Sequence, residues 1–84
     1  MEKLSREDIE KKVNAILVDK LFIEDEDCRP EARLVHELGA DSLDIVDIGM
    51  SLERSFGISI SDEQMEALSG LTVGELYDFI GEVL

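Results

Sequence analysis

Residues 37–53, ELGADSLDIVDIGMSLE, decide the fold because they hold both the start signal and the apolar pattern of one long helix. A glycine and a short polar cluster precede the apolar residues. Asp41 is the expected N-cap, and Asp44 follows three residues later, as in a capping box. Ser42 then lies one step inside the helix, where its hydroxyl is not needed as a cap. We therefore expect Ser42 to be exposed on the first turn.

The apolar residues of this expected helix form two stripes. At about 100° per residue, one stripe is about 100° wide and is the expected core face; it contains Ile45, Ile48, Gly49, Leu52 and Phe56. A second stripe, on another side of the helix, contains Leu43, Val46 and Met50. Two interpretations are open. The stripe is buried, either because this helix is central and surrounded by the others or because the third helix covers it; or the stripe is exposed and binds a partner. The acidic residues at its edges, as at many protein interfaces, favour the second interpretation; they are Asp44, Asp47 and Glu53.

Three further helix starts have the same pattern. A hydroxyl residue is followed three positions later by an acid or glutamine, which indicates a capping box, in the pairs Ser5–Asp8, Ser61–Gln64 and Thr72–Glu75. The first helix should run to about Lys20. Gly57 and Gly70 are the expected ends of the second and third helices, since glycine commonly follows the last helical residue.

A long connection, residues 21–40, separates the first two helices and contains the only proline, Pro30. Its interspersed apolar residues indicate a loop that packs on the core. The chain shows no strand alternation. The sequence therefore predicts an all-α fold, a small four-helix bundle with three longer helices, a short third helix and a long loop between helices one and two. At 84 residues we expect one domain over residues 1–84.

Charge excludes several classes of partner. The formal net charge is −13, and residues 34–84 carry eleven acids against the single base Arg54. Phosphate contacts need Lys and Arg, so nucleic-acid binding and attraction to an anionic membrane are not expected. The expected partners are basic protein patches, approached by electrostatic steering. No segment is apolar and long enough to insert in a membrane or to act as a signal peptide, so we expect a cytoplasmic location.

Ser42 is not expected to be a catalytic nucleophile. Such a serine needs a base and an oxyanion site. The only histidine, His36, lies six residues away, and no lysine follows Lys20. The neighbouring carboxylates would also oppose an oxyanion. We therefore predict no catalytic residue.

A metal site is not expected either. Asp25 and Asp27 match the first two positions of an EF-hand loop, but Arg29 and Pro30 break the pattern. Cys28 is the only cysteine, so no internal disulfide is possible. The acids around it should raise its pKa, and we interpret it as a small apolar filler.

The residues GADSLD, 39–44, resemble the attachment motif of the acyl carrier proteins. The likeness continues through RPEARLVHELGADSLDIVDIGMSLERSFGISI, residues 29–60, and the first, third and fourth helices extend it over nearly the whole chain. This resemblance implies that Ser42 receives 4′-phosphopantetheine from coenzyme A through a separate phosphopantetheinyl transferase. The thiol of that arm then carries acyl groups as thioesters between enzymes of fatty acid or related acyl assembly.

The resemblance also implies a docking surface on the second helix for basic patches of those enzymes, with a carrier that is itself non-catalytic and monomeric. By that likeness the docking residues are Asp41, Leu43, Asp44, Val46, Asp47, Met50 and Glu53. Periodicity alone had already pointed to the three apolar members.

Some residues depart from the family pattern. Arg54 and Ser55 stand where many relatives have further acids, Gly49 lies within the core stripe, and the connection Leu68 to Leu71 is longer than is common. Gly49 costs roughly 1 kcal/mol against alanine and permits either a closer neighbour or a longer acyl chain. A carrier of aminoacyl or polyketide groups, or an unmodified acidic helical module that binds a basic partner, remains an alternative. Only the carriers need the Ser42 hydroxyl.

Overall fold

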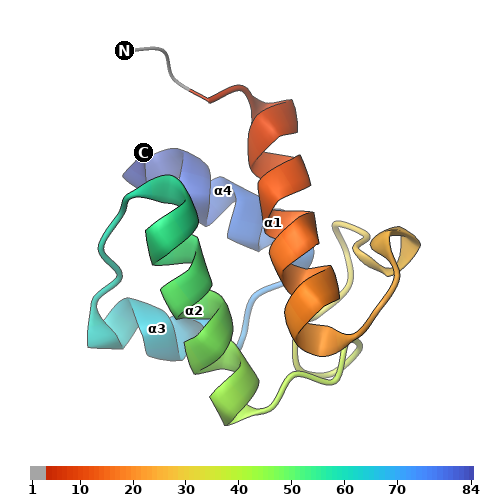
Figure 1. The fold of residues 1–84 in the computed structure, drawn as a ribbon. Coiled ribbons are helices and arrows are strands. Elements are labelled where there is room, and N and C mark those ends of the chain that lie inside the picture. Colours follow the sequence, from red (N-terminus) through yellow and green to blue (C-terminus); the bar gives the residue numbers. More distant parts are fainter. Residues whose placement is uncertain (1–3) are drawn as a thin grey trace.

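The computed structural model describes residues 4–84, so the first three residues of the expected domain lie outside it. Within this range the chain forms four α-helices and one short 3-10 helix (Figure 1). In chain order they are α1 (Arg6–Leu21), η1 (Asp25–Asp27), α2 (Ser42–Phe56), α3 (Asp62–Leu68) and α4 (Val73–Val83). The predicted all-α fold, with three longer helices and a short third one, is confirmed. No helix of the described residues has the length and apolar character needed to cross a membrane.

Every helix start predicted from the sequence is confirmed. All four α-helices begin with a complete capping box, in which the cap side chain and the side chain three residues later exchange hydrogen bonds with each other's backbone N–H groups. Helix α1 ends at Leu21, one residue beyond the expected Lys20. Helix α2 ends as predicted, with Gly57 in the left-handed conformation at φ 65°.

The predicted end of α3 at Gly70 is wrong. The helix stops at Leu68, and its C-cap is Ser69 in the right-handed conformation. The hydroxyl of Ser69 donates to the carbonyl of Glu66 at 2.9 Å, and the N–H of Gly70 donates to the carbonyl of Ala67 at 3.1 Å. These right-handed turns satisfy the last carbonyls, so no left-handed glycine is needed there.

The core lies where α1, α2 and α4 meet. Helix α1 packs on both α2 and α4, and α3 packs on α2 (Figure 1). Helices α1, α2 and α4 contribute buried apolar residues at helical spacing, and α3 contributes Leu68. The fully buried large side chains are Val13, Leu17, Leu34, Ile48, Leu52, Leu68, Val73, Leu76 and Ile80. The core is aliphatic apart from Tyr77, whose hydroxyl donates to the side-chain oxygen of Asn14 on α1. A polar pair thus links α1 to α4 at the edge of an apolar interior.

The long loop before α2 packs on the core, as predicted. Cys28, Ala32, Leu34 and Ala40 are buried. The loop is also joined to the start of α4, because Leu34 N–H donates to the Leu71 carbonyl at 3.1 Å and Val73 N–H donates to the Ala32 carbonyl at 2.9 Å. An isolated bridge between Arg33 and Thr72 is the only strand-like pairing within residues 4–84. These bonds fix the segment from which α2 departs.

Candidate functional site at the start of α2

Asp41 caps α2 and leaves Ser42 uncommitted. The Asp41 carboxylate accepts from Asp44 N–H at 2.8 Å, and the Asp44 carboxylate accepts from Asp41 N–H at 3.1 Å. Ser42 takes part in neither bond. It is the first helical residue, and it is exposed. The sequence-based division between a capping aspartate and an available serine is therefore confirmed in its geometry.

An apolar groove lies beside Ser42, between α2 and α3. Its volume is about 250 Å³, and its lining residues are Ser42, Ile45, Val46, Asp62, Met65, Glu66 and Ser69. The apolar walls come from both helices, while the acids of α3 stand at the edge. The groove thus places an exposed hydroxyl at the mouth of an apolar depression.

The residues of α3 in this groove were missed by sequence analysis. One of them is Met65. The structure shows that its side chain packs over Gly49: a Cβ built at Gly49 would lie 2.1 Å from the Met65 sulfur. The expectation that Gly49 admits a closer neighbour is confirmed. A mid-helix glycine on a core stripe was the available signal, but it did not identify which side chain would fill the space.

The second apolar stripe of α2 is exposed. Leu43 is 80% exposed, Met50 51% and Val46 45%. The alternative interpretation, in which the stripe is buried by α3 or by a central position of α2, is therefore wrong. Helix α3 instead packs against the edge of α2 that carries Gly49.

The acidic residues near this stripe differ in what else they do. Asp47 is exposed and its carboxylate lies 3.6 Å from the Lys20 ammonium at the end of α1. Asp44 is held in the capping box. Glu53 is half-buried, and its carboxylate accepts from Ile60 N–H at 2.8 Å. Asp41 and Asp47 are thus the exposed acids of the set, and Asp44 and Glu53 are half-buried. All four also take part in local structure, because Asp41 is the cap of α2 and Asp47 pairs with Lys20.

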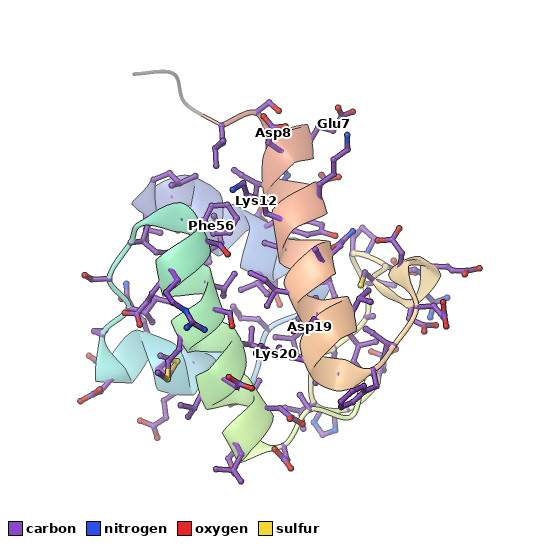
Figure 2. All side chains as sticks on the ribbon, in the orientation of Figure 1. Glu7, Asp8, Lys12, Asp19, Lys20 and Phe56 are labelled. Carbon is purple, nitrogen blue, oxygen red and sulfur yellow. The ribbon has the colours of Figure 1, made fainter. Side chains whose placement is uncertain are left out.

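The last turn of α2 carries one base and lies beside another on α1. Arg54 is exposed in the last turn, where a cation complements the helix dipole. Lys12 of α1 stands over the ring of Phe56 with its ammonium 5.8 Å from the ring centre (Figure 2). The negative field along α2 is therefore strongest at its start, beside Ser42.

The other residues considered as candidates are the loop histidine, the acids and the single cysteine. His36 is exposed in the loop. No group of three or more His, Cys, Asp or Glu residues within residues 4–84 is arranged to hold a metal ion. Cys28 is buried, and burial together with Asp25 and Asp27 raises its pKa to about 11. This agrees with the predicted role as an apolar filler, since a thiol in this environment has little thiolate at neutral pH.

Comparisons with known proteins identify the family. The family model described as "Phosphopantetheine attachment site" matches residues 11–80. The chain is also similar to a protein of Thermotoga maritima named "Acyl carrier protein", with 41% identity over 80 residues, which covers 95% of this chain and 96% of the relative. The matched region contains all of α2 and α3 with the exposed serine and its groove. The chain therefore belongs to the phosphopantetheine-binding acyl carrier protein family.

Proposed function

We propose that this protein is an acyl carrier in which Ser42 bears 4′-phosphopantetheine taken from coenzyme A. The observation that carries the proposal is the position of Ser42: exposed, first in α2, relieved of capping by Asp41 and placed at the mouth of an apolar groove. The family membership supports the same function.

The residues around Ser42 fit this prosthetic group. Attachment would place a phosphodiester at the N-terminus of a 15-residue helix, where the helix dipole favours an anion by about 0.3–1 kcal/mol. The apolar walls of the groove, Ile45, Val46 and Met65, suit an aliphatic chain, because burial of apolar surface is worth roughly 25 cal/mol per Å². Asp62 and Glu66 at the edge stay in contact with water.

The chain itself acts as a substrate in the attachment reaction. The Ser42 oxygen forms a bond to the pantetheine-bearing phosphorus of coenzyme A, the bond from that phosphorus to the adenosine bisphosphate breaks, and the serine proton passes to a base. The enzyme that catalyses the transfer supplies this base, which supports a separate phosphopantetheinyl transferase. When bound, the group supplies a terminal thiol that holds acyl cargo on a flexible arm.

The exposed face of α2 is the proposed docking surface for the transferase and for acyl-processing enzymes. It comprises Asp41, Leu43, Asp44, Val46, Asp47, Met50 and Glu53. An exposed apolar centre with acidic edges suits basic partners, with steering that brings fast and salt-sensitive association. We further propose that residues 1–84 form a single, monomeric domain and that the protein works in the cytoplasm, where its one free thiol, Cys28, stays reduced.

Intact mass tests the attachment site. The protein is incubated with coenzyme A and a phosphopantetheinyl transferase, and its mass is measured before and after. We expect the gain of one phosphopantetheinyl group on the wild type and no gain on Ser42→Ala. Ser69→Ala is the matched control, because Ser69 is another exposed serine lining the same groove; it should be modified like the wild type.

Two results would contradict the proposal. An unchanged mass of the wild type at every enzyme concentration would remove the carrier function. A full mass gain on Ser42→Ala would retain a modified protein but would place the attachment elsewhere in the chain.

A further inference from the structure

Phe22 is an unusual residue at the end of α1. Its side chain is 93% exposed, the largest exposure among the exposed large hydrophobic residues of the described chain. Its backbone has φ 57° and ψ 40°, and it is the one residue within 4–84 other than glycine with a positive φ. An aromatic residue thus occupies both a solvated position and a left-handed conformation.

Neither feature is explained by stability. The left-handed residue after a helix is usually glycine, because a Cβ is disfavoured in that conformation. The capping bond at this position, from Phe22 N–H to the Val18 carbonyl at 3.1 Å, needs only a backbone N–H. The exposed ring packs on no part of the core. Glycine would therefore close α1 better, so the ring calls for a role outside the folding of this chain.

The position of Phe22 relates it to the proposed site. Helices α1 and α2 run in opposite directions, so the end of α1 lies beside the start of α2 (Figure 1). The pair of Lys20 and Asp47, whose charged atoms lie 3.6 Å apart, joins these two ends, and Lys20 is seen at the lower end of α1 next to α2 (Figure 2). Phe22, which directly follows α1, therefore lies at the same end of the molecule as Ser42 and Leu43, the first residues of α2.

We propose that Phe22 is an aromatic anchor that extends the docking surface from α2 to the end of α1. Its occupant is an apolar pocket with a basic rim on the phosphopantetheinyl transferase, so this inference rests on the proposed function. The transferase must surround Ser42 and therefore covers this end of the molecule. Three exposed acids surround this end of α1, namely Asp19, Glu24 and Asp47. Lys20 pairs with Asp19 and Asp47 and so offsets one of the three charges, and the remaining negative charge favours a basic rim. Aromatic residues, Phe included, are enriched at protein interfaces, and a few central side chains carry most of the binding energy there.

Kinetics with the organism's own transferase test the anchor. Initial rates of transfer from coenzyme A are measured at increasing concentrations of wild type, Phe22→Gly, Phe22→Leu and Leu84→Ala. We expect Phe22→Gly to raise the KM for the carrier about 10-fold, which corresponds to about 1.4 kcal/mol, while kcat stays within about 2-fold of the wild type. Phe22→Leu keeps an apolar side chain and should raise KM no more than about 3-fold.

Stability separates docking from folding. Because glycine suits the left-handed position, Phe22→Gly should raise Tm by about 4 °C or more while it weakens docking. Leu84→Ala is the control: Leu84 is also an exposed apolar residue, 41% exposed, but it lies at the C-terminus, away from the lower end of α1 (Figure 1). This variant should leave KM unchanged.

The outcomes distinguish this inference from the proposed function. A wild type that is not modified removes both. A wild type that is modified, with Phe22→Gly equal to it in KM, overturns the anchor and leaves the carrier function intact. A concentration-dependent dimer of the wild type that is lost in Phe22→Gly, measured by sedimentation, would assign the ring to a second copy of this chain and also overturn the proposal.

Discussion

At the start of α2, two neighbouring residues have separate tasks. Asp41 accepts the capping hydrogen bond from Asp44 N–H at 2.8 Å, and the exposed Ser42 has no part in it. A serine that capped its own helix would exchange that bond for a covalent group when modified. With the cap on Asp41, modification of Ser42 leaves the helix start intact. This separation predicts different stability effects for the two residues.

Asp41→Ala should lower the free energy of unfolding by about 1 kcal/mol, because a cap is lost at a helix that supplies much of the core. Ser42→Ala should stay within about 0.5 kcal/mol of the wild type, as do most substitutions at exposed sites. Urea denaturation of the unmodified proteins measures both. Asp41→Asn retains a capping oxygen and serves as the control. Equal losses for Asp41→Ala and Ser42→Ala would contradict the division of tasks.

Cys28 predicts a pH dependence of stability. Burial first, and then Asp25 and Asp27, raises its pKa to about 11 from the ordinary value of 9.0. The folded state therefore keeps the thiol proton when the unfolded state has lost it. The resulting stabilisation is fully present below the unfolded pKa, and it is lost as the pH rises through the folded pKa. Between about pH 9 and about pH 11 the free energy of unfolding should therefore fall.

Denaturant unfolding at a series of pH values measures this fall. Tyr77 also has a raised pKa, from its burial, so the wild-type curve contains more than one group. The difference between wild type and Cys28→Ala isolates the thiol. This difference should shrink as the pH rises above 9. A difference that is constant across the series would show that Cys28 does not titrate with unfolding.

At the scale of the element, helix starts could be predicted because their signals are local. Each capping box needs two residues three positions apart, such as Ser61 and Gln64, and all four formed. The exposed stripe on α2 followed from helical periodicity in the same way. Contacts between distant segments have no such signal. The bridge from Arg33 to Thr72 and the left-handed Phe22 depend on how elements meet in space.

The packing of α3 on α2 gives a prediction at Gly49. A methyl group there would overlap the sulfur and terminal carbon of Met65, at 2.1 and 2.7 Å. These atoms are the flexible end of a half-buried side chain that can shift, and the cost of shifting it offsets the gain in helix propensity of about 1 kcal/mol. Gly49→Ala should therefore leave the free energy of unfolding within about 0.5 kcal/mol of the wild type. Thermal or urea unfolding of the variant measures the change.

Met65→Ala provides the background that tests this cause. With the thioether removed, Gly49→Ala should stabilise the protein by about 1 kcal/mol, the full gain in helix propensity. The double-mutant cycle then gives a coupling energy of about 1 kcal/mol between the two positions. Additive effects would show that Met65 moves aside freely and that the groove is not held by this contact.

At the scale of the whole molecule, the charge of −13 directs how the carrier meets its partners. The proposed docking face holds two exposed acids near the start of α2, Asp41 and Asp47. Asp47→Lys leaves the capping box intact and should lower the association rate with a basic transferase about 10-fold at low salt. It should also flatten the salt dependence. Asp44→Lys with Asp47→Lys should lower the rate further, but it removes the capping partner as well.

The control has the same charge change at other places. Glu7→Lys with Glu82→Lys matches the double reversal in net charge, and both residues are exposed, on α1 and α4. Stopped-flow association rates compare the two pairs. If both pairs lowered the rate equally, the net charge of the molecule would steer the encounter and the proposed face would have no special part in it.

The same charge predicts opposite salt effects on folding and docking. The radius of gyration is 11.6 Å, close to the Debye length of about 10 Å at 0.1 M salt, so at low ionic strength the acids repel one another across the whole molecule. Raising NaCl from about 0.01 M to about 1 M shortens the Debye length from about 30 Å to about 3 Å. We expect Tm at pH 7 to rise by about 4 °C or more, since like-charge repulsion destabilises the compact state, while association with a basic partner slows over the same range.

Near pH 4.2, the sequence pI, the net charge vanishes and the rise in Tm should vanish with it. A Tm at pH 7 that stayed constant or fell with salt would show that local pairs such as Lys20 with Asp47, rather than net repulsion, dominate the electrostatics of the fold.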